Sequence, residues 1–182
     1  MNKKAILLSV KPKYVAEILN GRKTIEIRKS APKCAGAYDL PIDVYIYCTR
    51  EGIRKKPLFV NSHVANGKVV AKFTLRKVDK FHVLPSERIL PFNPNVEELL
   101  LPLCLTKEDV MNYGNGEDFY AYFWYIEDLV IFDEPFYINE HLFHLPVKKK
   151  DIEPIFVSSI MKAPQSWCYC QYIECDDDEE ED

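Results

Sequence analysis

The sequence contains no long apolar segment, and this absence limits where the protein is expected to act. A membrane-spanning helix needs about 20 apolar residues in a row, and no run in the 182-residue chain approaches that length. The start, MNKKAILLSVKPKY, is basic, but its apolar part is too short for a secretory signal and lacks a small-residue cleavage site. We therefore expect a cytoplasmic protein with no membrane partner.

Motifs of the common nucleotide- and metal-dependent enzymes are absent as well. The sequence has no Walker loop, GxSxG or Rossmann glycine pattern, and its four histidines form no HExxH pair. Its six cysteines include no CxxC pair. Cys168, Cys170 and Cys175 could together bind a metal, but no second pair matches them, so we expect reduced, packed thiols. The sequence predicts neither a metal site nor a cofactor.

Acidic residues are scarce in the first part of the chain, and basic residues are scarce in the second. Residues 1–80 have 18 Lys and Arg against 6 Asp and Glu, a balance of +12, whereas residues 81–182 have 6 against 22, a balance of −16. Eight of these acids lie in the last nine residues, and such a block predicts a solvated tail over 174–182. The basic first half favours a phosphate-bearing partner, although a lysine-rich surface that only aids solubility fits the same count.

The hydrophobic pattern predicts one α+β domain over residues 1–173. Hydrophobic residues make up 47% of the chain and aromatic residues 13%, which suits a buried core and favours strands. No βαβ unit repeats, so a small, mostly antiparallel β-barrel with a few peripheral helices fits best. We predict helices at 12–20 and 106–114, the second with Thr106 and Asp109 as its capping pair. We predict strands at 5–10, 24–29, 43–49, 68–81 and 163–173, and β structure over 119–135 with a break near Glu127 and Asp128.

A charged cluster marks the turn between the first helix and the next strand. The segment GRKTIEIRK, residues 21–29, alternates two isoleucines with Glu26 and Arg28. Gly21 tolerates the positive φ of a sharp turn, which places Lys23 at the strand entrance. Arg28 presents a fork that suits a phosphate or a base edge, and Glu26 can accept a hydrogen bond from an exocyclic amine. The same residues could instead form a structural ion pair that only holds the turn.

The segment NGRKTIEIR fits G-x-K-x-x-E-x-R and resembles the signature of the ASCH domain family. AILLSVKPKYVAEIL, VYIYCT and NGKVVAKFTL resemble other blocks of the family in the same order, and APQSWCYC resembles the ending of a branch common in Firmicutes genomes and their phages. The resemblance covers residues 5–173. It implies a barrel similar to that of PUA RNA-binding domains, with RNA or a modified nucleoside as the partner.

The resemblance also implies an enzymatic alternative. Some small bacterial members remove acyl groups from N4-acylated cytidines with a Lys, a Thr and a Glu, and others are described as ribonucleases. The Lys corresponds to Lys23, but Glu26 stands at the position of the Thr, which removes the hydroxyl nucleophile. An amidohydrolase or ribonuclease would therefore use Lys23 and Glu26. A deep cleft with Lys23 buried beside a carboxylate would favour an enzyme, and an open groove lined with exposed lysine and arginine would favour a binding protein.

Further candidates for ligand contact lie outside this motif. Two lysines at the first strand–helix junction could bind phosphate or only solvate the helix start. The two tryptophans offer flat surfaces for stacking on a base, or they belong to the core. A polar pair before the second tryptophan could read a base edge. The predicted ligand-binding set is Lys11, Lys13, Lys23, Glu26, Arg28, Trp124, Gln165, Ser166 and Trp167.

The acidic tail allows a third interpretation, in which the protein regulates an interaction. Residues 176–182 are all acidic and are tethered to a basic first half, so the tail could occupy the protein's own basic face and compete with nucleic acid. A tail that only aids solubility is the alternative. The sequence does not determine the oligomeric state.

Overall fold

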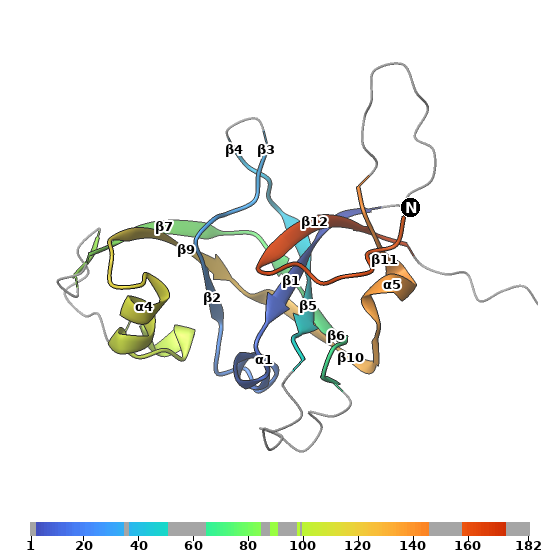
Figure 1. Cartoon of the computed structure of the whole chain (residues 1–182), viewed down its shortest axis with the longest axis horizontal. Helices are drawn as coiled ribbons and strands as arrows, with labels where there is room; N and C mark the ends of the chain where they lie inside the picture. The colour runs from blue at the N-terminus through green and yellow to red at the C-terminus, as the bar shows by residue number, and fades with distance from the viewer. Residues whose placement is uncertain are drawn as a thin grey trace, which may run out of the picture. The chain divides into compact units, whose positions relative to one another are not determined.

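A computed structural model describes residues 3–34, 37–50, 65–84, 88–90, 98, 100–145 and 158–173 (Figure 1). Contacts divide the chain into two compact units. The first unit comprises Met1–Pro12, Asp43–Lys72 and Ile131–Asp182, and the second comprises Lys13–Ile42 and Phe73–Val130. The acidic tail and most of the polar segment between the strands predicted at 43–49 and 68–81 lie outside the described residues.

The first unit contains most of a six-stranded sheet with the order β10-β6-β5-β1-β12-β11. β1 (Lys3–Val10) lies inside it, antiparallel to β12 (Trp167–Tyr172) and parallel to β5 (Ile42–Cys48). The remaining elements are β6 (Val69–Leu75), β10 (Glu127–Phe136), α5 (Ile138–His141) and β11 (Leu142–Phe143).

The apolar runs of β1 and β5 explain their inner positions in that sheet. Every residue from Ala5 to Val10 is buried, and β5 is buried along nearly its whole length. A strand that is apolar on both faces is stable only where both faces are covered. Tyr45 and Tyr47 accordingly pack in the core, with the Tyr45 ring stacked on Tyr172 at 5.0 Å.

The second unit is built on a four-stranded sheet with the order β2-β9-β7-β8. These strands are β2 (Ile25–Arg28), β9 (Phe119–Tyr125), β7 (Val78–Leu84) and β8 (Arg88–Leu90). The unit also holds helix α1 (Pro12–Leu19), whose first residue is assigned to the other unit, the hairpin of β3 (Lys33–Cys34) and β4 (Ala37–Tyr38), the short helix η1 (Leu101–Leu103) and helix α4 (Lys107–Tyr113).

One face of this sheet carries the core of the second unit. The register pairs Ile25 with Tyr125 and Ile27 with Phe123, so these side chains share a face. They pack in one cluster with Val110 of α4 and with Leu103 of η1. The alternate residues of β2, Glu26 and Arg28, therefore lie on the opposite face, as the sequence predicts.

The ends of the predicted helices agree with the structure. α1 begins at Pro12, and Gly21 after it has φ +70°. α4 starts with the predicted capping box, in which the Thr106 hydroxyl accepts from the Asp109 N–H at 3.0 Å and the Asp109 carboxylate accepts from the Thr106 N–H at 2.9 Å. These bonds satisfy backbone groups that the helix itself leaves without partners.

The structure divides two of the predicted β segments, one of them where the sequence predicts a break. The strand predicted at 68–81 is wrong as a single element, because β6 ends at Leu75 and β7 begins at Val78 in another sheet. Leu75 and Val78 are both buried. They are three positions apart, and one regular strand would place them on opposite faces, so the strand cannot continue through this point. The break predicted within 119–135 is confirmed, because β9 ends at Tyr125 and β10 begins at Glu127. Asp128, near this break, has φ +48°.

The described residues confirm a mixed α+β fold rich in strands. Antiparallel pairing joins β1 with β12, β2 with β9, and β7 with both β8 and β9, whereas β1 and β5 run parallel. The described strands form three separate sheets, so closure into one barrel stays a prediction. In the described part of the chain, no helix has the length and hydropathy needed to cross a membrane.

Candidate functional site

The turn after α1 brings the backbone into β2. The Gly21 N–H donates to the Ile18 carbonyl at 2.9 Å, and the Lys23 N–H donates to the Glu17 carbonyl at 3.0 Å. The left-handed conformation of Gly21 lets the chain reverse while these bonds form. The turn therefore fixes the backbone of Lys23 before the strand begins.

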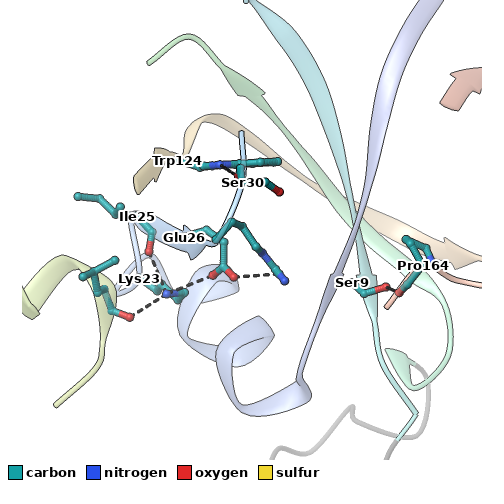
Figure 2. A network of polar contacts seen from close by, with 9 residues as sticks. Ser9, Lys23, Ile25, Glu26, Ser30, Trp124 and Pro164 are labelled. Carbon is teal, nitrogen blue, oxygen red and sulfur yellow. Dashed lines mark hydrogen bonds and ion pairs between the residues drawn. The ribbon is translucent and has the colours of Figure 1, made fainter. Parts of the chain in front are cut away.

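The Lys23 side chain is buried, with 2% of the residue exposed. Its ammonium donates to the carbonyl oxygens of Ile25 at 2.9 Å and Leu103 at 2.8 Å, and it lies 3.2 Å from Glu26 Oε2. Figure 2 shows Lys23 pointing toward Ile25 and Glu26. An ammonium has three donors, and the two carbonyl oxygens take two of them, whereas Glu26 is held as an ion pair. Lys23 thereby ties β2 to η1.

Glu26 lies between two cations on the polar face of β2. Its Oε1 accepts from Arg28 Nη2 at 2.9 Å, while its Oε2 faces the Lys23 ammonium without the geometry of a hydrogen bond. The side chains of Glu26 and Arg28 are only 7% and 10% exposed. The charged cluster Lys23–Glu26–Arg28 therefore has one more cation than anion in a largely water-free setting, where charges interact strongly.

Tyr113, at the end of α4, belongs to the surroundings of this cluster and was not predicted. Burial raises the pKa of Tyr113, and the nearby charge of Arg28 acts in the opposite direction. The phenol therefore stays protonated at neutral pH. Lys29 Nζ lies 5.2 Å from the centre of the Tyr113 ring. Sequence spacing gives no signal for this contact, because it joins residues more than 80 positions apart.

Lys13 lies at the surface of the same unit. Its Nζ is 4.4 Å from the centre of the Tyr14 ring, and the buried Lys23 Nζ is 5.3 Å from the same ring. A hydrogen bond with Tyr14 raises the pKa of Lys13. Lys13 is therefore charged at neutral pH and is exposed, and its contact with a phosphate stays a prediction.

Trp124 is fully buried, with 0% of the residue exposed. It pairs with Glu26 across β2 and β9, and its indole N–H donates to the Ser30 carbonyl at 3.2 Å (Figure 2). These contacts favour core packing over base stacking. Trp124 fastens the chain that follows β2 to the neighbouring strand.

The remaining predicted residues belong to the first unit. Lys11 and Gln165 are exposed, and the Ser166 carbonyl accepts from the Ser9 N–H at 2.9 Å. Trp167 is half-buried and meets the Tyr169 ring edge-on at 5.5 Å. The predicted set is thus divided between the units, with Lys13, Lys23, Glu26, Arg28 and Trp124 in the second.

Comparison with known proteins gives a family match and a fold match. A sequence model of the ASCH domain matches residues 8–130. Two crystal structures of variants of the Zymomonas mobilis ASCH protein are each 17% identical to this chain, with TM-scores of 0.54 and 0.55. A third structure of ASCH from that organism is 14% identical, with a TM-score of 0.50.

The structural alignment extends over most of this chain and most of each chain aligned with it. The three alignments cover 93%, 94% and 93% of this chain and 90%, 89% and 87% of the other chains. At such low identity the likeness concerns the fold alone. Among curated proteins, no sequence matches this one significantly.

Proposed function

The chain belongs to the ASCH domain family, and from this premise we propose that it binds RNA or a modified nucleoside in a basic cleft around the G-x-K-x-x-E-x-R motif. The observation that carries the proposal is the buried cluster of Lys23, Glu26 and Arg28. Burying three ionised groups costs free energy that apolar side chains would not cost. In this proposal the cluster is retained because it holds Arg28 in place for a ligand.

Each residue of the cluster has a separate role in this proposal. Lys23 is a positioning residue: its bonds to two carbonyl groups fix its ammonium 3.2 Å from Glu26 Oε2. Glu26 Oε1 then orients the guanidinium of Arg28. A planar guanidinium held in one orientation suits a phosphate or the edge of a base. Arg28 is the ligand contact, and Lys13 adds an exposed positive charge in the same unit.

Binding of labelled RNA oligomers, followed by fluorescence anisotropy at low salt, tests the proposal, with modified nucleosides as competitors. Arg28→Gln should weaken binding about 10- to 150-fold, since it removes a charged hydrogen-bonding group. Arg28→Lys should recover only part of the loss, because it keeps the charge but not the fork. Arg22→Gln is the matched control, because it removes an exposed arginine from the adjacent turn. Absence of RNA and nucleoside binding in the wild type would refute the proposal.

A hydrolase is the second candidate, and one observation favours it. Lys23 is buried 3.2 Å from a carboxylate oxygen, which is the arrangement expected of an enzyme. Its ammonium also bonds two carbonyl groups, so catalysis by Lys23 would require these bonds to break. Chromatography of N4-acetylcytidine and of RNA oligomers after incubation tests this candidate. Product formation by the wild type, lost in folded Glu26→Gln, would establish an amidohydrolase or a ribonuclease.

The finer family assignment is also a proposal. Residues 1–173 would form the functional domain with a PUA-like barrel, and residues 174–182 would form a separate acidic tail. The ending APQSWCYC supports placement in the branch common in Firmicutes genomes and their phages. A cytoplasmic location suits a protein that binds RNA.

A further inference from the structure

The polar face of the four-stranded sheet carries more than the charged cluster. In β9, Ala121 and Phe123 face the core, so Tyr120 and Tyr122 lie on the other face. The register places His82 of β7 opposite Tyr120. Lys80 of β7 and Arg28 of β2 both lie opposite Tyr122, on either side of it. The motif therefore shares a sheet face with a set of tyrosines and basic residues.

Four of these side chains form a continuous series with Lys33 and Tyr38 of the β3–β4 hairpin. The His82 ring stacks on Tyr120 at 4.7 Å with an interplanar angle of 25°. Lys80 Nζ lies 3.6 Å from the centre of the Tyr120 ring and 6.0 Å from that of Tyr122. Lys33 Nζ lies 5.9 Å from the centre of the Tyr122 ring and 5.4 Å from that of Tyr38. We call His82, Tyr120, Lys80, Tyr122, Lys33 and Tyr38 the lysine–tyrosine row.

The row is accessible to solvent and predominantly basic. Tyr120 is 50% exposed and Tyr38 is 38% exposed, and both lysines are exposed. Asp118 at one end bonds His82 at 3.0 Å. Glu26 on the same face is already engaged by two cations. The exposed rings and the excess of lysine together complement a strand of unpaired bases joined by phosphates.

We propose that the lysine–tyrosine row binds single-stranded RNA, with bases stacked on Tyr120 and Tyr38 and phosphates held by Lys80 and Lys33. This inference rests on the proposed function and extends it from the charged cluster along the sheet. Exposed aromatic rings bind unpaired bases of any sequence, and adjacent cations follow the backbone. The long stem of Lys80 lets its ammonium leave the Tyr120 ring for a phosphate as a base stacks there. A duplex cannot bind this way, because its bases are already stacked.

Anisotropy with a labelled uridine 12-mer tests the row, with a duplex of mixed sequence and equal length as the comparison. Tyr120→Ser should weaken binding of the single strand about 5- to 150-fold, the range measured for loss of one stacking ring. Tyr120→Phe keeps the ring and should bind within about twofold of the wild type. Lys80→Gln should lower the slope of log K against log salt by about 0.7, the value expected for one phosphate contact to a single strand. Tyr137→Ser removes an exposed tyrosine of the first unit and should change nothing.

The outcomes separate this inference from the proposed function. If Arg28→Gln loses RNA binding while Tyr120→Ser and Lys80→Gln match the wild type, the proposed function stands and the row is wrong. If the wild type binds no RNA at low salt, both fail. Equal affinity for duplex and single strand would overturn stacking. Self-association of the wild type that Tyr120→Ser abolishes, with RNA binding unchanged, would assign the row to a protein contact instead.

Discussion

At the scale of single residues, Lys23 shows how one side chain can be both charged and structural. Its ammonium is buried among two backbone carbonyls and a carboxylate. Removing the ammonium would take a hydrogen-bond donor from each carbonyl at the point where β2 meets η1, and loss of a buried hydrogen bond is costly. The stability of the second unit should therefore depend on Lys23 more than on any exposed lysine.

Lys23→Met tests this dependence, because it keeps an unbranched stem and removes the ammonium. We expect a loss of about 3–5 kcal/mol in the free energy of unfolding, since Glu26 would lose a partner in a buried site. Urea denaturation followed by circular dichroism measures it. Lys13→Met, at the exposed lysine on the same Tyr14 ring, should change stability by no more than about 0.5 kcal/mol. A loss below about 1 kcal/mol in Lys23→Met would contradict the structural role.

Gly21 gives a second prediction at this scale. Its φ is +70°, and a Cβ built on it has no neighbour within 4 Å, so only the backbone conformation opposes a side chain. Gly21→Ala should therefore destabilise the protein by about 1–2 kcal/mol. Gly21→Asn should cost less, because Asn tolerates the left-handed region. Equal urea midpoints for wild type and Gly21→Ala would contradict this prediction, because the turn would then accept a side chain without loss of stability.

At the scale of elements, α4 is defined by its capping box. The Asp109 carboxylate accepts from the backbone N–H and the hydroxyl of Thr106, both at 2.9 Å. These hydrogen bonds lower the pKa of Asp109, with the backbone bond acting most strongly. Val110, one residue later, is buried in the core that α4 shares with β2 and β9. Fraying of this helix end would therefore expose apolar surface of the sheet.

Thr106→Ala should lower the free energy of unfolding by about 1 kcal/mol, because it removes an N-cap acceptor. Urea denaturation measures this difference.

The lowered pKa of Asp109 makes the stability of the protein depend on pH. Its stabilisation is present above the ordinary Asp pKa of about 4 and is lost as pH falls through the lower folded value. The stability difference between wild type and Asp109→Asn should therefore be larger at pH 7 than at pH 2.5. An equal difference at both pH values would exclude this contribution.

At the scale of the whole molecule, charge is distributed unequally along the chain. Residues 1–80 carry a balance of +12, and residues 176–182 are all acidic. A short tether gives an effective concentration in the mM range, so weak attraction is enough to place a tail near a basic surface. Contacts between exposed charges are individually weak and are screened by salt. A tail that competes in this way would lower non-specific binding of nucleic acid, whereas a tail that only aids solubility would leave it unchanged.

Truncation after Cys175 tests the tail. If it competes with RNA, the truncated protein should bind RNA more tightly at low salt, and the gain should fade as salt is added. RNA binding by both forms should weaken steeply with salt, because lysine and arginine displace counterions from phosphates. Anisotropy titrations at several salt concentrations measure both effects. Unchanged affinity at low salt would leave the tail with a solubility role.

Much of the local structure could be predicted from the sequence. Pro12 at the start of α1, Gly21 after its end and the Thr106 capping box act on neighbouring residues, so their effects do not depend on the rest of the chain. The alternation in TIEIRK likewise placed Ile25 and Ile27 on one face and Glu26 and Arg28 on the other. Family membership followed from the order of four short blocks, and the family model agrees over residues 8–130.

The pairing of distant segments was decided only by the tertiary structure. Lys23 reaches the Leu103 carbonyl across 80 positions, and Trp124 reaches the Ser30 carbonyl across 94. The lysine–tyrosine row needs the register of β7 against β9, which no local pattern encodes. Spacing within a strand determines which residues share a face. Which other strand pairs with a given strand depends on how the apolar surface of the whole chain is buried, so only the tertiary structure determines the pairing.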